Sequence, residues 1–143
     1  MFGEEPDPEF AQDTLARTMW GEARNQGNIG MQAVANVVMN RVANPSWWGD
    51  DVISVCKKPY QFSCWNESDP NLPKLMAVTF DDPQFAEASI IAGNAISGNL
   101  PDITGGADSY CVIGTDPAWA RNIQPTATIG KHEFYKTVNT TTA

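Results

Sequence analysis

The segment from Gly30 to Val42 constrains the fold most, because its apolar side chains surround nearly the whole circumference of a helix. Its apolar residues are Met31, Val34, Ala35, Val37, Val38, Met39 and Val42. A helix that is apolar on almost every side must be covered by other elements, so we expect it at the centre of the domain. The polar residues Gln32, Asn36 and Asn40 share one narrow stripe at i, i+4 spacing.

A second helix is predicted directly before this segment. Asp7 followed by Pro8 is typical of an N-cap and a first helical residue, although Asp13 offers a later start. Apolar residues then recur at helical spacing at Leu15, Ala16, Met19 and Ala23. Gly27 tolerates the positive φ at which helices often end. Glu22 therefore falls in the last turn of the first helix, between two helices with buried faces.

The rest of the chain predicts shorter elements. A short helix is expected over residues 52–56, another from Asn71, and a longer one from Asp82 to the stop at Gly98. From Thr104 onward the helical periodicity gives way to alternating character, which is typical of paired strands. The pattern predicts an α+β fold, mainly helical with a small antiparallel β-sheet or hairpin.

Length and composition favour a single domain. A chain of 143 residues with 42% hydrophobic and 18% charged residues can bury a core without metal or disulfide support. We expect one catalytic domain over residues 1–143, with an ordered core over residues 8–136, acting as a monomer. No apolar run is long enough to span a bilayer, and MFGEEPDPEF lacks the basic and apolar stretches of a signal peptide. We therefore expect synthesis in the cytoplasm and no membrane insertion.

The acidic balance excludes some partners. A formal net charge of -8 disfavours nucleic acid and anionic lipid, since both are bound through basic patches that release counterions. A neutral sugar polymer is a feasible substrate. The one histidine, His132, and the absence of an H-E-x-x-H pattern disfavour a zinc enzyme, so we expect no metal and no cofactor.

Three cysteines allow one disulfide at most. Cys56 and Cys64 flank a turn and could form a bridge in an oxidising compartment, which would leave Cys111 as a thiol. The alternative is that all three are small buried apolar residues.

Glu22 is the candidate for acid catalysis. Cleavage of a glycosidic bond requires a proton on the leaving oxygen, and a carboxyl group delivers it near neutral pH only if its environment raises its pKa. Met19, Trp20 and Ala23 could provide the apolar cover. Composition alone favours an ordinary exposed glutamate near a helix end.

Four segments together resemble the SleB/CwlJ-type cell wall hydrolases, which act in spore cortex lysis, bacterial wall turnover and phage lysis. They are LARTMWGEARNQGNIGMQAVANVVMNRV from Leu15, QFSCWN from Gln61, TGGADSYC from Thr104 and IGKHEFYK from Ile129. The resemblance runs from Leu15 to Tyr135 in the family's order. It implies a lysozyme-like domain that degrades peptidoglycan, with Glu22 at the position of the family's proposed acid.

The resemblance also implies a mechanism. Family enzymes resemble lytic transglycosylases, in which one glutamate protonates the bond between N-acetylmuramic acid and N-acetylglucosamine and then helps to close a 1,6-anhydro ring. The alternative is a hydrolytic muramidase with a second carboxylate. Asp108 is the leading candidate for that carboxylate, followed by Glu133 and Asp116. Asp108 departs from the family pattern, which more often has an uncharged residue there.

Further motif residues are expected to bind substrate. These are Gln61, Ser63, Trp65, Gly105, Gly106, Asp108 and Tyr110. The amide and hydroxyl groups can bond sugar substituents, the glycine pair permits close backbone approach, and Tyr110 can pack on a ring or orient Glu22. Trp47, Trp48 and Trp119 are additional stacking candidates. Each has a structural alternative, and the glycine pair could simply be a tight turn.

Other residues are expected to be structural. We expect Phe62 to be a core residue rather than a substrate contact. We expect Arg41 to tie a loop or helix end, and His132 to brace the fold or the cleft floor.

Two other classes compete with a glycan-cleaving enzyme. Cys64 or Cys111 followed by His132 has the chain order of a thiol peptidase or amidase of the wall. A non-catalytic glycan-binding virion protein is least favoured, since the GEA segment is intact. Size and N-terminus favour a phage endolysin acting on the cell wall or in the periplasm, and a bacterial or virion-associated enzyme fits almost as well.

Overall fold

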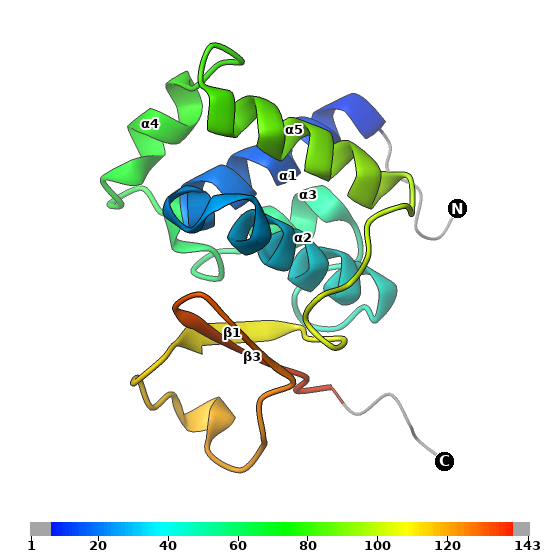
Figure 1. Ribbon diagram of the computed structural model, residues 1–143, viewed down its shortest axis with the longest axis vertical. Helices are drawn as coiled ribbons and strands as arrows, with labels where there is room; N and C mark the ends of the chain where they lie inside the picture. The colour runs from blue at the N-terminus through cyan, green and yellow to red at the C-terminus, as the bar shows by residue number, and fades with distance from the viewer. Residues whose placement is uncertain (1–6, 139–143) are drawn as a thin grey trace.

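The structure is a computed structural model that describes residues 7–138, with helices above a small sheet (Figure 1). In chain order the elements are α1 Pro8–Ala23, η1 Arg24–Gln26, α2 Gly27–Ala43, α3 Val52–Lys57, η2 Ser63–Trp65, α4 Asn71–Ala77, α5 Pro83–Ile96, β1 Ser109–Val112, η3 Ala118–Ala120, β2 Ala127–Ile129 and β3 His132–Tyr135. The predicted mainly helical α+β class is therefore confirmed.

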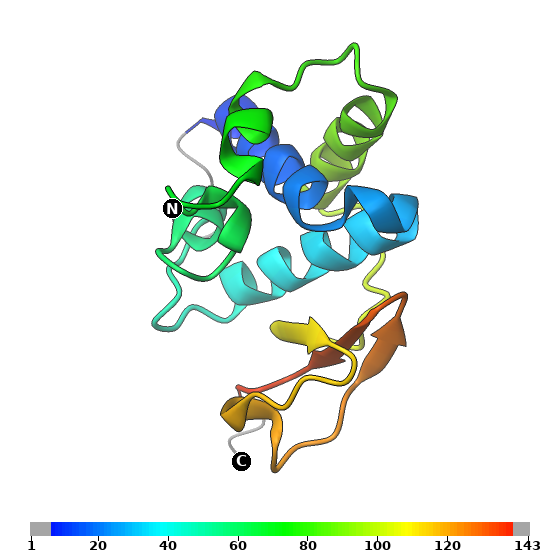
Figure 2. The same ribbon diagram turned by 90° about the vertical axis from the view of Figure 1, so that its left-hand side faces the viewer.

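Helix α2 lies at the centre, as its apolar circumference predicts. It contacts α1, α3 and α5 on one side and β2 on the other, and Figure 2 shows it between the helical layer and the sheet. Met31, Val34 and Val37 are almost completely buried. The helix begins at Gly27 rather than at Gly30, because only the short turn η1 separates it from α1.

The predicted caps of α1 and α5 are present. An Asp7 carboxylate oxygen accepts a hydrogen bond from the backbone N–H of Phe10 at 3.3 Å, so α1 begins at Pro8 rather than near Asp13. The Asp82 carboxylate caps α5 in the same way. Because α1 ends at Ala23, Glu22 lies in its last turn.

The polar stripe of α2 holds the segment that leads into the sheet. Gln32 and Asn36 both donate to the carbonyl oxygen of Pro101, at 2.9 and 3.0 Å. Asn40 donates to the carbonyl oxygen of Ala107 at 2.8 Å. These bonds satisfy backbone acceptors of the segment before β1 and fix where the chain enters that strand.

The sheet is antiparallel with strand order β1-β3-β2. Tyr110 of β1 pairs with Phe134 of β3, and the Phe134 ring is buried in the core. Strand β1 lies at an edge of the sheet, so one of its two hydrogen-bonding edges has no strand partner within residues 7–138.

No disulfide joins Cys56 and Cys64 in the structure; both side chains are buried, and Cys111 is half-buried. The cysteines thus follow the expectation of small buried residues more closely than that of a bridge.

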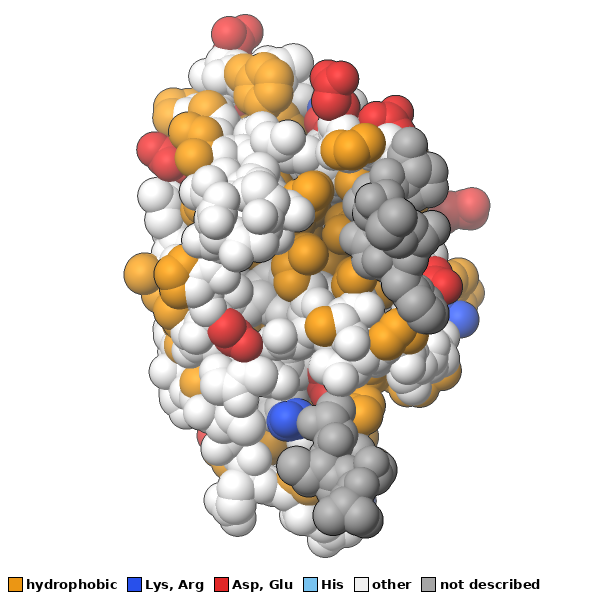
Figure 3. Space-filling model, turned by 90° about the vertical axis from the view of Figure 1, so that its right-hand side faces the viewer, with side chains coloured by type: hydrophobic (Ala, Val, Ile, Leu, Met, Phe, Trp, Pro, Cys, Tyr) orange, Lys and Arg blue, Asp and Glu red, His pale blue; other side chains and the backbone are white. Residues whose placement is uncertain are grey.

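The surface has an acidic character, in line with the net charge of -8. On the face in Figure 3, apolar side chains gather in the middle and carboxylates are scattered around them. Within residues 7–138, none of the helices combines the length and apolar character needed to cross a membrane.

Candidate active site

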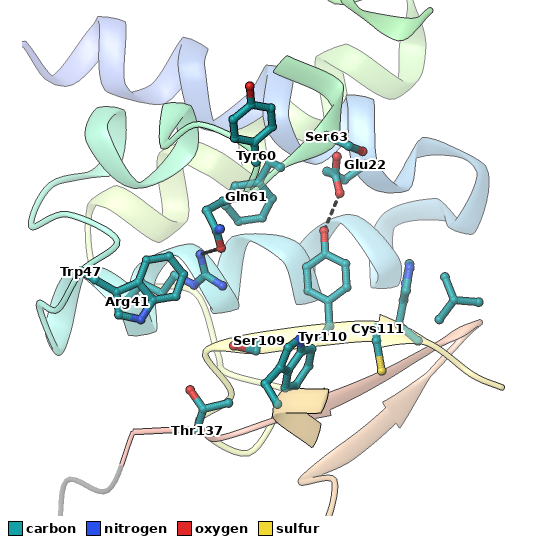
Figure 4. Close-up of a pocket in the computed structure, with 14 residues that line it drawn as sticks. Glu22, Arg41, Trp47, Tyr60, Gln61, Ser63, Ser109, Tyr110, Cys111 and Thr137 are labelled. Carbon is teal, nitrogen blue, oxygen red and sulfur yellow. Dashed lines mark hydrogen bonds between the residues drawn. The ribbon is translucent and has the colours of Figure 1, made fainter. Parts of the chain in front are cut away.

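A cleft of about 670 Å³ opens beside the exposed edge of β1, a volume typical of ligand sites. Figure 4 shows that its walls come from the end of α1, the end of α2, the 60–63 loop and the sheet. The lining residues are Glu22, Arg41, Trp47, Tyr60, Gln61, Phe62, Ser63, Ser109, Tyr110, Cys111, Val112, Trp119, His132 and Thr137.

Glu22 is held in this cleft by two hydrogen bonds from different elements. The Tyr110 hydroxyl donates to Oε1 at 2.7 Å, and the backbone N–H of Cys64 donates to Oε2 at 3.2 Å. The first bond is drawn in Figure 4. The carboxylate is thus fixed between α1, the η2 turn and β1. The expectation that Tyr110 orients Glu22 agrees with this geometry.

The two groups beside Glu22 keep their protons. Burial, followed by the nearby Glu22 carboxylate, raises the pKa of the Tyr110 hydroxyl and of the Cys64 thiol. Tyr110 is therefore a hydrogen-bond donor at neutral pH. Cys64 is a poor nucleophile, because a reactive cysteine requires the opposite shift.

His132 lines the cleft beside Tyr110. Its Nδ1 pairs with the Gln26 amide at 3.1 Å, and its ring contacts the Tyr110 ring edge-on at 4.9 Å between centroids. Burial lowers the pKa of His132 despite the opposing effect of Glu22. The ring bonds the helical layer rather than a thiol, which agrees with the expectation that it braces the cleft floor.

Gln61 and Ser63 both line the cleft, where the sequence placed them. The side-chain amide oxygen of Gln61 accepts a hydrogen bond from Arg41 at 3.4 Å, and the NH₂ group of the same amide can donate to a ligand in the cleft. Arg41 also donates to the carbonyl oxygen of Asp108 at 2.6 Å. It therefore ties a loop, as expected, and lines the cleft as well. Phe62 is buried yet forms part of the wall.

Three exposed aromatic side chains border the cleft. Trp47 is 57%, Tyr60 85% and Trp119 44% exposed, so all three have faces available for contact. Tyr60 adopts a φ of 66°, a left-handed conformation unusual for a bulky residue. Trp48 instead is a core residue, 1% exposed.

Trp65 lies outside the cleft, contrary to expectation. Its Nε1 donates to the Thr18 hydroxyl at 2.9 Å, and the Lys57 ammonium lies 4.9 Å from its ring centroid. The first contact holds η2 against α1 and the second holds it against α3, so Trp65 supports the loop that carries Gln61 and Ser63.

Asp108 does not line the cleft either. It is 4% exposed, and its carboxylate accepts hydrogen bonds from the Thr137 and Val138 backbones and from the Thr137 and Ser109 hydroxyls. The sequence could not show this, because the donors come mostly from the far end of the chain. Asp108 therefore fastens the segment after β3.

The other two candidate carboxylates are also elsewhere. Glu133 accepts a weak hydrogen bond from Tyr135 at 3.4 Å, and Asp116 forms an exposed ion pair with Arg121 at 3.2 Å. Neither is among the cleft-lining residues.

The glycine pair forms a turn and is not among the residues that line the cleft. Gly105 and Gly106 have φ values of 71° and 84°, and a Cβ on Gly105 would lie 3.1 Å from Thr126. The Asp102 carboxylate fastens the turn through the backbone N–H groups of Thr104 and Gly106. The tight-turn alternative is therefore the one observed.

The structure adds cleft residues that the sequence analysis did not propose as contacts to a glycan. Tyr60, Ser109, Cys111, Val112 and Thr137 all line it. Ser109, Cys111 and Val112 lie on β1 beside Tyr110, so their position next to a predicted site residue could have indicated them. Thr137 follows β3, and nothing in its sequence position indicated a place in the cleft. Within residues 7–138, no group of three or more His, Cys, Asp or Glu side chains is arranged to hold a metal ion.

Comparisons with known proteins agree on one family. Residues 25–135 match the family described as Cell Wall Hydrolase, a range that begins after Glu22. The crystal structure of the catalytic domain of the Bacillus cereus SleB protein superposes with a TM-score of 0.71 at 26% identity, covering 95% of this chain and 98% of that one.

A second structure gives the same result. The catalytic domain of the germination-specific lytic transglycosylase SleB from Bacillus anthracis has a TM-score of 0.64 at 26% identity, covering 88% of this chain and 93% of that one. No curated protein matches the chain in sequence. The motifs, the fold and the family match lead to one conclusion: the chain is an enzyme that belongs to the cell wall hydrolase family, of the SleB/CwlJ type.

Proposed function

We propose that this enzyme cleaves peptidoglycan glycan strands between N-acetylmuramic acid and N-acetylglucosamine as a lytic transglycosylase, with Glu22 as its catalytic residue. The observation that carries the proposal is that Glu22 is the only carboxylate among the described residues that line the cleft. The similarity to a structure named as a lytic transglycosylase supports it.

Glu22 can serve both steps. The protonated carboxyl donates its proton to the glycosidic oxygen, and the bond from that oxygen to C1 of the muramic acid breaks. The carboxylate then accepts the proton of the C6 hydroxyl of the same sugar, whose oxygen bonds to C1. The products are a 1,6-anhydro sugar and a free hydroxyl on the leaving sugar, and no water is consumed. Tyr110 and the Cys64 N–H position the carboxylate throughout.

The alternatives have less support. A muramidase requires a second carboxylate roughly 5–9 Å from the first, and Asp108, Glu133 and Asp116 all lie outside the cleft. A peptidase using Cys64 requires a thiolate, which burial and Glu22 disfavour by raising the pKa of that thiol. The phage endolysin setting stays a prediction, testable by following host lysis after deletion of the coding sequence from a phage that carries it.

Mass spectrometry of digested peptidoglycan tests the proposal. The wild-type protein should release muropeptides lighter by one water than hydrolytic products, and Glu22→Gln should release none. Glu87→Gln, which alters an exposed glutamate on α5, is the matched control and should act like wild type. Reducing-end sugars that depend on Glu22 would instead identify a muramidase. Cut peptide stems with Glu22 dispensable would refute glycan cleavage.

A further inference from the structure

Arg41 is a buried cation in the wall of the cleft. Its side chain belongs to α2 and is only 6% exposed, in a protein whose net charge is -8. Arg17 and Arg121 form ion pairs with Asp13 and Asp116. Among the residues that the structure describes, no carboxylate lies within ion-pair distance of Arg41.

The hydrogen bonds of Arg41 to described residues go to neutral oxygens. Nε donates to the Asp108 carbonyl oxygen at 2.6 Å, and Nη1 donates to the Gln61 amide oxygen at 3.4 Å. A guanidinium carries five N–H donors in a planar fork. The contacts with Asp108 and Gln61 use two of these donors. The remaining donors can serve a ligand in the cleft.

The positive charge of this guanidinium is only partly balanced by its surroundings. Burial lowers the pKa of Arg41, and the Asp108 carboxylate, beyond ion-pair distance, only partly opposes this. That carboxylate is already saturated by donors such as Thr137. The rings of Trp48 and Phe62 lie 5.0 and 5.5 Å from the guanidinium carbon and supply weak cation–π contacts. Buried charges are normally paired, yet within residues 7–138 no carboxylate forms an ion pair with Arg41.

We propose that Arg41, together with Gln61 and Trp47, forms a subsite for a carboxylate on the substituent of the muramic acid ring. Of the two sugars in a glycan strand, only muramic acid carries a lactyl ether on C3. Its carboxyl is either free or joined to a peptide stem that bears further carboxylates. An arginine fork matches a carboxylate in a bidentate manner.

The position of Arg41 in the cleft fits this assignment. In Figure 4, Arg41 and Trp47 lie to one side of Tyr110, away from Glu22, and Gln61 lies between the two groups. A muramic acid ring with C1 at Glu22 could therefore extend its C3 substituent along β1 toward Arg41. The inference rests on the proposed glycan cleavage, and it implies selectivity for peptidoglycan over chitin, which lacks the lactyl group.

A series of substrates tests the subsite with the wild-type protein. The series compares stem-free glycan strands before and after methyl esterification of the lactyl carboxylate, and stem-bearing strands before and after esterification of the stem carboxylates. Loss of the charged partner should raise KM by roughly tenfold to a hundredfold with little change in kcat. The pair that responds identifies the source of the carboxylate. Equal KM values within both pairs would overturn the proposal.

Variants of Arg41 add a second test. Arg41→Met should bind charged and esterified strands equally, and Arg41→Lys should recover part of the discrimination. Arg121→Met, which removes an exposed arginine outside the cleft lining, should discriminate like wild type. If the Arg41 variants do not fold, the substrate series alone decides.

Binding separates this inference from the proposed function. Tryptophan fluorescence of Glu22→Gln reports binding of both series without turnover. Cleavage by wild type together with binding that ignores the carboxylates would refute the subsite and leave the enzyme assignment intact. Carboxylate-dependent binding, with no glycan product from the wild-type protein, would refute the proposed glycan cleavage and leave the subsite intact.

Discussion

Removing the Tyr110 hydroxyl should reduce turnover while leaving the cleft wall in place. Tyr110→Phe deletes the 2.7 Å hydrogen bond to Glu22 Oε1, whereas the 3.2 Å bond from the Cys64 N–H to Oε2 remains. A hydrogen bond to a charged group contributes about 1.5–3 kcal/mol, and about 1.4 kcal/mol corresponds to a factor of ten. Because one anchor persists, we expect the lower end of that range, a fall in kcat of roughly tenfold.

The assay is the initial rate of release of soluble muropeptides from purified glycan strands, measured over a range of substrate concentrations. KM should change little, because the ring of Tyr110 still lines the cleft. Tyr135→Phe is the matched control, since it removes a hydroxyl bonded to Glu133 outside the cleft lining. An unchanged kcat in Tyr110→Phe, or an equal fall in the control, would refute the positioning role.

Three other substitutions test the remaining contacts. Asp108→Asn should lower the free energy of unfolding by about 2–3 kcal/mol, because the N–H and hydroxyl donors of Thr137 lose a charged acceptor. Urea denaturation measures this change, and a variant as stable as wild type would contradict the proposed role of Asp108 in holding the segment after β3. Burial lowers the pKa of His132, so the unfolded chain takes up the proton first and the wild type should lose thermal stability as pH falls below 6.5. His132→Gln should remove that loss, and parallel Tm curves against pH for the two proteins would contradict this. Asn40 holds the chain that leads into β1, and β1 carries Tyr110. Asn40→Ala should therefore lower kcat less when Tyr110 is already replaced by Phe than it does in wild type. Equal effects in the two backgrounds would show that Asn40 does not act through Tyr110.

Helix positions were predictable from the sequence because their determinants are local. Asp7 and Asp82 each supply a cap within a few residues, and the apolar circumference of α2 leaves no position for it but the centre. The position of Glu22 followed from these boundaries. Its role as the proposed acid came from the family motif, since an isolated glutamate near a helix end is chemically ordinary.

Other site residues could not be assigned, because partners distant in sequence decide what they do. Asp108 stands in a motif segment, yet Thr137 and Val138 turn its carboxylate away from the cleft. Trp65 follows Ser63 by two residues, yet Thr18 on α1 holds its ring outside. In a motif, residue type indicates what chemistry is possible, and the fold determines which side chains face the substrate.

Helix α2 connects the proposed Arg41 subsite to the position of Glu22, the proposed acid. Its polar stripe fixes the chain that enters β1, which carries Tyr110 to Glu22. Arg41 directly follows Asn40 in the sequence, but its side chain lines the cleft and bonds Gln61. A substrate anion bound by Arg41 would therefore contact the same helix that fixes the position of β1 and Tyr110. Because α2 is packed among α1, α3, α5 and β2, this contact would hold the sugar in register with Glu22. Binding energy at the C3 substituent would then be used for alignment at C1.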